Sequence, residues 1–292
     1  MSAQKKTILV TGGAGFVGAN LIKRLVADGN RVISLDVYFA GKKDAHVDGA
    51  EYREGHTKDI EQLVPENVDL IYHLGEYARV EQSLSEPDIV WDLNIAGTFA
   101  VVEYWRKRAR AGHTCKLIYA GSSTKFGDSG LARDATPYAW MKATNTELVR
   151  NYGAWYKLPY AITYFYNVYG HGERTGRYGT VVAFFADMAR KGESITVTLP
   201  GTQTRNFTHV DDIVEGLALV GEKGEGDGYG LGAERAYSIL EVAKMFSDNI
   251  TMLPERLGNR SSSGVNNTKS KELGWSPKHD LGDYVKGIVG KA

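Results

Sequence analysis

The sequence predicts an α/β protein with a doubly wound parallel sheet and a smaller C-terminal α/β region. Short apolar runs alternate with segments whose apolar residues recur at helical spacing, and such alternation favours a parallel sheet. The first apolar run, residues 7–10, leads into a glycine-rich segment and then into a helix predicted over residues 19–28. Beyond residue 170 the pattern changes, and predicted helices mix with short strands and loops.

The remaining elements follow from the same two periodicities. Strands are predicted over residues 31–36, 51–53, 68–74, 116–120 and 160–165. Helices are predicted over residues 94–105, 137–156, 180–191 and 211–220. The glycine-rich stretch 221–228 is expected to be a loop. We divide the chain into residues 1–168 and 169–292, and expect it to cross back between the two parts once or twice.

Composition excludes several classes of protein. The 35 Lys and Arg balance 35 Asp and Glu, so the formal net charge is zero and no nucleic-acid partner is expected. The single cysteine, Cys115, excludes an intramolecular disulfide and fits a reducing compartment, and its apolar setting favours a buried structural thiol. No signal peptide is evident, and no apolar run approaches about 18 residues. We therefore expect a soluble, cytoplasmic protein that does not contact membranes.

The glycine-rich segment has the spacing of a dinucleotide-binding turn. Gly13, Gly15 and Gly18 fit G-x-G-x-x-G, and Gly12 begins the overlapping pattern G-x-x-G-x-x-G. Glycines between a strand and a helix let a pyrophosphate approach the free N–H groups of the helix N-terminus. Asp36 ends the second predicted strand, where a carboxylate accepts ribose hydroxyls and repels a 2′-phosphate. These residues predict a Rossmann-like domain that binds NAD rather than NADP.

Tyr138 and Lys142 form a candidate catalytic pair. They lie four residues apart, on one face of the helix predicted over residues 137–156. A phenol is a weak base near neutral pH, but a nearby ammonium, a helix N-terminus and a cationic nicotinamide ring all stabilise its phenolate. Ser122 follows the predicted strand 116–120, and the carboxyl ends of such strands line the ligand crevice. Its hydroxyl is therefore expected on the cofactor side, with the pair.

Together these features resemble the extended short-chain dehydrogenase/reductase family, and most closely its nucleotide-sugar epimerases and dehydratases. Further segments resemble that branch in the same order: residues 73–83, the Asn-x-x-Gly-Thr of 94–98, the Asn-Val-Tyr-Gly of 167–170, the Arg-Asn-Phe…Val-Asp-Asp of 205–212 and the Leu-Gly-Trp-x-Pro of 273–277. The resemblance is strongest to UDP-hexose 4-epimerases. It implies bound NAD, a UDP-sugar substrate, and a homodimer formed through the helices over residues 94–108 and 137–156.

The resemblance also implies roles for individual residues. Ser122 and Tyr138 would contact the sugar 4-hydroxyl as catalytic groups, and Lys142 would hold the nicotinamide ribose and tune the phenol. Cofactor contacts are expected from Gly12, Gly15, Phe16, Val17, Gly18, Asp36, His56, Thr57, Leu74, Gly75, Asn94, Lys142 and Tyr164. Substrate contacts are expected from Arg79, Ser122, Ser123, Thr124, Tyr138, Asn167, Arg205, Arg256, Asn259 and Ser263. A plain turn asparagine is the alternative interpretation of Asn167. No metal site is expected.

The residues after Ser122 separate the reactions that this family catalyses. Its dehydratases carry Asp-Glu directly after the catalytic serine or threonine, and its decarboxylases carry Glu at the second position. Here these positions hold Ser123 and Thr124, which supply no carboxylate. Reductive members usually prefer NADPH, against the presence of Asp36. We therefore expect 4-epimerisation of a UDP-hexose through a transient 4-keto sugar. Another epimerase or keto-reductase of the family, and a non-catalytic NAD-binding regulator, are the alternatives.

A short segment near the C-terminus bears on the size of the sugar. Residues 256–259 resemble the family's Arg-x-Gly-Asp, with Asn259 in place of the acid. In the 4-epimerases, the residue four positions further gates the pocket beside the sugar C2, and here it is Ser263. A small residue resembles the enzymes that also accept N-acetyl sugars. If the alignment of this segment is shifted, the gating position falls on Ser261, Ser262 or Gly264, and the residue there is again small. We therefore expect UDP-N-acetylglucosamine and UDP-N-acetylgalactosamine to be accepted.

Overall fold

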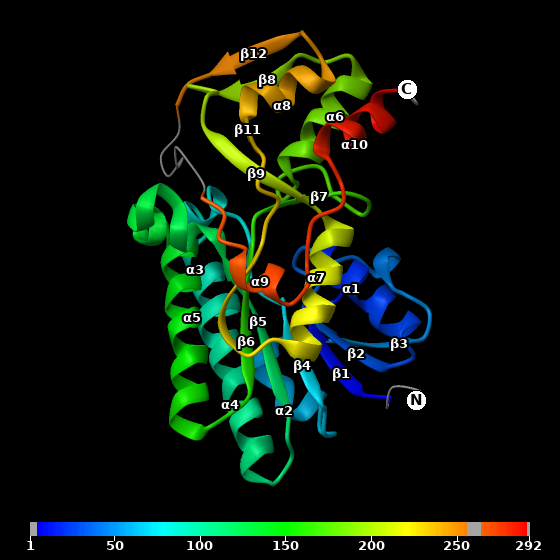
Figure 1. Ribbon diagram of the computed structural model, residues 1–292, viewed down its shortest axis with the longest axis vertical. Helices are drawn as coiled ribbons and strands as arrows, with labels where there is room; N and C mark the ends of the chain where they lie inside the picture. The colour runs from blue at the N-terminus through cyan, green and yellow to red at the C-terminus, as the bar shows by residue number, and fades with distance from the viewer. Residues whose placement is uncertain (1–4, 256–263, 291–292) are drawn as a thin grey trace.

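A seven-stranded parallel sheet forms the centre of the computed structural model, which describes residues 5–255 and 264–290 (Figure 1). Its strands, in spatial order, are β10 (Gly226–Leu231), β6 (Tyr160–Phe165), β5 (Lys116–Ser122), β4 (Leu70–His73), β1 (Thr7–Thr11), β2 (Arg31–Asp36) and β3 (Ala50–Glu54). Every neighbouring pair is parallel. The order reverses between β1 and β4, and such a reversal opens a crevice at the carboxyl ends of the strands.

Helices cover both faces of this sheet, which confirms the Rossmann-like, doubly wound arrangement (Figure 1). One face is covered by α2 (Ile60–Leu63), α4 (Gly97–Arg110) and α5 (Pro137–Tyr156), and the other by α1 (Phe16–Ala27) and α7 (Val210–Lys223). Successive side chains of a strand point to opposite faces. Thus Leu9 packs in the core beneath α4 and α5, whereas Val10 packs in the core beneath α1 and α7.

A smaller region lies beyond the carboxyl edge of the sheet, at the top of Figure 1. It contains the sheet β11 (Ala236–Ser238), β9 (Thr204–His209), β7 (Asn167–Tyr169) and the parallel pair β8 (Ile195–Thr198) and β12 (Ile250–Leu253). Its helices are α6 (Val181–Lys191), α8 (Ile239–Phe246) and α10 (Leu281–Val289). Phe185, Val197 and Val242 belong to its separate hydrophobic core.

Short elements connect these parts. They are η1 (Lys43–Ala45), η2 (Thr57–Asp59), η3 (Gln82–Leu84), α3 (Pro87–Val90), the π-helical η4 (Trp91–Ala96), η5 (Ser123–Asp134) and α9 (Thr268–Glu272). The chain also crosses back: after β9, helix α7 packs on α1, and β10 then joins the central sheet beside β6. The assignment of one part to the cofactor and the other to the nucleotide sugar stays a prediction.

The prediction of a loop over residues 221–228 is wrong. Helix α7 continues to Lys223, and β10 begins at Gly226. Gly221 lies against Tyr72, where a Cβ atom would be 2.0 Å from the phenolic oxygen. Close packing of this helix on β4 therefore requires a glycine there, and tertiary contact overrides the low helix propensity of that residue.

Two other expectations concern Cys115 and the membrane. Cys115 is fully buried, which confirms the predicted structural thiol, and burial raises the pKa of this thiol to about 12. A thiol with such a pKa forms almost no thiolate near neutral pH, so it is a poor nucleophile. In the described part of the chain, no helix combines the length and the hydropathy needed to cross a membrane.

The first prediction concerns self-association through α4 and α5. Phe99 on α4 and Trp140 and Trp155 on α5 are 51%, 40% and 64% exposed. Such exposed aromatic side chains are typical of interaction surfaces. We predict a homodimer, which light scattering at micromolar concentration would detect as twice the chain mass of 32.1 kDa.

Phe99→Glu should convert this dimer to a folded monomer. Met252→Glu, at an exposed apolar residue of the smaller region, is the matched control and should leave the dimer intact. A monomeric mass for the unmodified protein at the same concentration contradicts the prediction.

Candidate active site

A cavity of about 500 Å³ lies at the carboxyl ends of the central strands, where the strand order reverses. It is lined by the glycine-rich turn after β1, by the segments after β2, β4 and β5, and by the first turns of α5. The predicted site residues among its lining are Gly12, Gly15, Phe16, Val17, Gly18, Asp36, His56, Thr57, Leu74, Gly75, Arg79, Ser122, Ser123, Thr124, Tyr138, Lys142 and Asn167. Residues from distant parts of the sequence therefore share one hollow.

The glycine-rich turn has no room for side chains at Gly12, Gly13 and Gly18. Gly12 has a φ of +71°, and a Cβ atom on it would lie 2.7 Å from the Cα of Gly75. A Cβ atom on Gly18 would lie 2.2 Å from the carbonyl oxygen of Gly12. Helix α1 begins directly after Gly15, and no side chain caps its first N–H groups. The turn thus offers free backbone donors to an anion such as a pyrophosphate.

Asp36 is held at the end of β2 by two backbone donors. Its carboxylate accepts hydrogen bonds from the N–H of Ala14 at 2.9 Å and of Tyr38 at 2.7 Å. The side chain is buried beside the cavity, and this burial raises the pKa of Asp36 above its ordinary value. Each oxygen keeps a second lone pair for a ribose hydroxyl. The turn and this carboxylate together fit NAD, and the negative charge opposes the 2′-phosphate of NADP.

The three residues predicted as catalytic all line the cavity. The hydroxyl of Tyr138 lies 3.2 Å from the Oγ atom of Ser122, which also accepts a hydrogen bond of 2.9 Å from the hydroxyl of Thr124. Thr136 caps helix α5 through the N–H of Ala139, so Tyr138 lies in the first turn, near the positive end of the helix dipole. Lys142 follows one turn later and is also buried.

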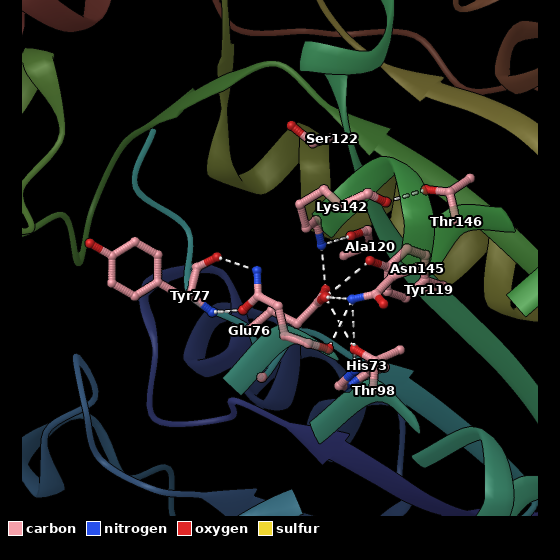
Figure 2. Close-up of polar contacts among 12 residues, drawn as sticks. His73, Glu76, Tyr77, Thr98, Tyr119, Ala120, Ser122, Lys142, Asn145 and Thr146 are labelled. Atoms are coloured by element: carbon pink, nitrogen blue, oxygen red, sulfur yellow. Dashed lines mark hydrogen bonds and ion pairs between the residues drawn. The ribbon is translucent and has the colours of Figure 1, made fainter. Parts of the chain in front are cut away.

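Lys142 pairs with an acid that the sequence analysis did not select. Figure 2 shows its ammonium directed at the carboxylate of Glu76, and it also donates to the carbonyl oxygen of Ala120. Glu76 directly follows His73-Leu74-Gly75, where the similar family segment has alanine. That departure was the signal that should have identified it. An ammonium has three N–H groups, so one is left for a hydroxyl in the cavity.

His73 links this pair to the end of β1. Complete burial lowers the pKa of His73 to about 4, so its ring is neutral near pH 7. Its Nδ1 atom lies 2.7 Å from the hydroxyl of Thr11, and its Nε2 atom lies 2.9 Å from that of Thr98. Because Thr98 donates its proton to Glu76 at 3.1 Å, we assign the histidine proton to Nε2. The chain of hydrogen bonds thus runs from β1 through β4 to α4.

Two predicted cofactor residues do not line the cavity. The side-chain amide of Asn94 bonds to both the N–H and the carbonyl of Tyr77, at 2.6 and 3.1 Å, and so supports the segment after β4. Tyr164 points into the core beneath α4 and α5, and its hydroxyl donates to Asp227 at 2.6 Å. The alternation of side chains along β6 places it on that face, so the structure does not support a direct cofactor contact for Tyr164.

The predicted substrate residues are divided between two cavities. An adjoining cavity of about 1120 Å³ is lined by Arg205, and Asn167 and Thr124 line both cavities. Arg79 reaches the smaller cavity, but its Nε atom donates to the carbonyl oxygen of Tyr178 at 2.8 Å. Arg256, Asn259 and Ser263 lie outside the described residues.

The sequence analysis also missed the segment between β7 and α6. Residues 178–180 line the smaller cavity, although they carry no chemical motif. The ring of Tyr178 packs with Phe39, from the segment after β2, with ring centroids 5.1 Å apart. Only the folded chain brings these two segments together.

Comparison with known proteins agrees with this geometry. A family model described as the NAD dependent epimerase/dehydratase family matches residues 8–232. A relative from Methanocaldococcus jannaschii named putative UDP-glucose 4-epimerase is 27% identical over 301 residues, which cover 97% of each chain. A UDP-N-acetyl-alpha-D-glucosaminuronate decarboxylase from Bacillus cytotoxicus is 30% identical, with 82% of this chain and 79% of the relative covered.

Solved structures give the same assignment. The UDP-glucose 4-epimerase of Thermotoga maritima, solved with UDP-glucose, has a TM-score of 0.89 and 26% identity, and 97% of each chain is covered. The UDP-glucose 4-epimerase of Thermus thermophilus, solved with NAD, has a TM-score of 0.86 and 26% identity, with 97% of this chain and 98% of that chain covered. The motifs, the fold and these matches show that the chain belongs to the NAD dependent epimerase/dehydratase family, with NAD as its cofactor.

Proposed function

We propose that this protein is a cytoplasmic, NAD-dependent 4-epimerase of a UDP-hexose. One observation carries the proposal: Ser122, Tyr138 and Lys142 share a cavity in which the two residues after Ser122 supply no carboxylate. The relatives include a decarboxylase, so the choice between reactions depends on the residues of the site. Glu76, whose carboxylate lines the cavity, is already bound by Lys142 and by neighbouring donors.

The arrangement suits reversible oxidation at the sugar C4. Tyr138, as phenolate, accepts the proton of the 4-hydroxyl, and the hydroxyl of Ser122 hydrogen-bonds to the same oxygen. The charge of Lys142 stabilises the phenolate. Bound NAD would supply the acceptor for the hydride removed from C4 and the donor of that hydride to the other face of the 4-keto sugar. Tyr138 then returns the proton, so the enzyme ends each turnover unchanged.

The larger cavity beside the catalytic residues supports a bulky, charged substrate. Arg205 lines it, and a guanidinium binds phosphate oxygens well. We therefore place the UDP moiety there and the sugar between the two cavities. Rotation of the 4-keto sugar, which epimerisation requires, takes place in this joined space.

Two measurements test the proposal. Mass spectrometry of the denatured protein should detect released NAD. Incubation with UDP-, dTDP-, GDP- and CDP-sugars, followed by NMR of the anomeric protons, should show interconversion of a UDP-hexose pair. Release of carbon dioxide from a UDP-sugar acid, or no turnover of any sugar by an NAD-loaded protein, contradicts it.

Tyr138→Phe provides the second prediction. Removal of the acid–base hydroxyl should lower kcat by at least about 100-fold, which is typical of one positioned proton-transfer group. The fold should persist, because the ring is retained. Tyr152→Phe, on the same helix, removes a hydroxyl that donates to Glu103 at 2.7 Å, away from the cavity, and should keep kcat within about twofold. Near-normal turnover by Tyr138→Phe refutes its assignment.

The third prediction concerns cofactor choice. The buried carboxylate of Asp36 should make the protein bind NADH at least about tenfold more tightly than NADPH, as equilibrium titration would measure. Asp36→Asn keeps the size of the side chain and removes its charge, so the preference should shrink. A protein that is purified with NADP, or that binds NADPH more tightly, contradicts this interpretation.

The fourth prediction concerns Ser263. We expect UDP-N-acetylglucosamine and UDP-N-acetylgalactosamine to interconvert. Ser263→Tyr should suppress that activity more strongly than activity on UDP-glucose, because a phenol would fill space beside the sugar C2. Turnover confined to the non-acetylated pair, or an equal loss of activity on both pairs, would show that Ser263 does not limit the size of the sugar.

A further inference from the structure

Glu76 is a buried acid in a position that the proposed reaction does not use. Its side chain is 3% exposed and that of Lys142 is 6% exposed. Figure 2 shows the two groups facing each other at the end of β4, with Lys142 extending from α5. Both residues line the cavity that Ser122 and Tyr138 also line. The ion pair therefore borders the space assigned to the nicotinamide half of the cofactor.

The surroundings of Glu76 hold an ionised carboxylate. Besides the ammonium of Lys142, its oxygens accept hydrogen bonds from the hydroxyl of Tyr119 at 3.0 Å, the amide of Asn145 at 2.8 Å and the hydroxyl of Thr98 at 3.1 Å. All of these groups donate hydrogen bonds to the carboxylate oxygens, which is the arrangement expected around a charged acceptor. These donors belong to β5, α4 and α5. The carboxylate is therefore held in place by three separate elements.

Stability alone does not explain such a pair. Desolvation of two buried charges opposes their attraction, and apolar side chains of similar size often fill the space at lower cost. The two charges differ in their effect on the cofactor. The oxidised nicotinamide ring is cationic and the reduced ring is neutral, so an uncompensated ammonium beside it disfavours the oxidised form. The carboxylate of Glu76 compensates that charge.

We propose that Glu76 is a positioning residue of the active site: it anchors the Lys142 ammonium and, by compensating its charge, favours NAD⁺ over NADH at this site. The inference rests on the proposed placement of the nicotinamide beside Tyr138 and Lys142. An enzyme that must return its hydride to the substrate in every turnover benefits from this bias, since it opposes accumulation of a reduced, idle form.

Glu76→Gln tests the inference, because glutamine keeps the shape and can still accept hydrogen bonds at one oxygen. The purified protein is equilibrated with equal amounts of NAD⁺ and NADH, free cofactor is removed, and both bound forms are quantified after denaturation. The ratio of bound NAD⁺ to NADH should fall by about tenfold or more, the usual effect of removing one nearby charge. Glu103→Gln, which neutralises an acid paired with Arg106 outside the cavity, should leave the ratio unchanged.

Two further variants separate charge from structure. Lys142→Met should raise the ratio, and Glu76→Gln combined with Lys142→Met should return it close to the original value, because the buried net charge is again zero. If Glu76→Gln alone does not fold, comparison of Lys142→Met with the double variant isolates the same carboxylate, and the ratio should again fall. An unchanged ratio in either comparison of folded proteins overturns the inference.

These measurements need no sugar substrate. A shifted ratio in a protein that turns over no sugar would support the role of Glu76 and contradict the proposed function. An unchanged ratio in an active epimerase would support the proposed function and contradict the role of Glu76.

Discussion

The reversal of strand order between β1 and β4 is the constraint on which the rest of the structure depends. Because all seven strands are parallel, their carboxyl ends lie on one edge of the sheet, and the chain leaves β1 and β4 toward opposite faces. A crevice at this point is unavoidable. The glycine-rich turn forms one wall, the segment from Leu74 to Glu76 forms the other, and Gly12 and Gly75 approach too closely for side chains between them.

Several of the protein's buried polar groups lie at that edge. Within the sheet, apolar side chains fill the cores on both faces, but Thr11, His73 and Thr98 form a continuous chain of hydrogen bonds that ends at Glu76. A buried polar group costs free energy unless its bonds are satisfied, and each member of this chain satisfies the next. The network therefore gives Lys142 a fixed position relative to Ser122 and Tyr138, which a solvent-exposed lysine would not have.

The smaller region completes the site through the segment between β7 and α6. Arg174 in this segment donates to the carbonyl oxygen of Ala14 in the glycine-rich turn at 3.0 Å, and Asn20 of α1 donates to that of His171 at 3.2 Å. Further along, the carbonyl of Tyr178 accepts from Arg79. One segment is thus tied both to the glycine-rich turn and to Arg79, and these line the same cavity.

The sequence by itself determined the parts that depend on near neighbours. The strand–turn–helix around Gly12 to Gly18, the acid Asp36 and the pair Tyr138 and Lys142 all rely on backbone conformation or on a spacing of a few residues. Alternating strands and helices also predicted the parallel sheet, with most boundaries within a few residues. The prediction of a loop over residues 221–228 failed, because Gly221 lies within α7 and allows that helix to pack on Tyr72.

Only the tertiary structure decided which distant residues converge. Glu76, Thr98 and Asn145 come from separate elements and carry no shared spacing, yet Thr98 and Asn145 both donate to the carboxylate of Glu76, which pairs with Lys142. Tyr164 was expected to contact the cofactor, but the pleat of β6 directs its side chain into the core and away from the cavity. The physical reason is the same in each case: a contact between segments depends on how whole helices and strands pack, and on the face to which each side chain is directed, whereas a motif depends only on its own few residues.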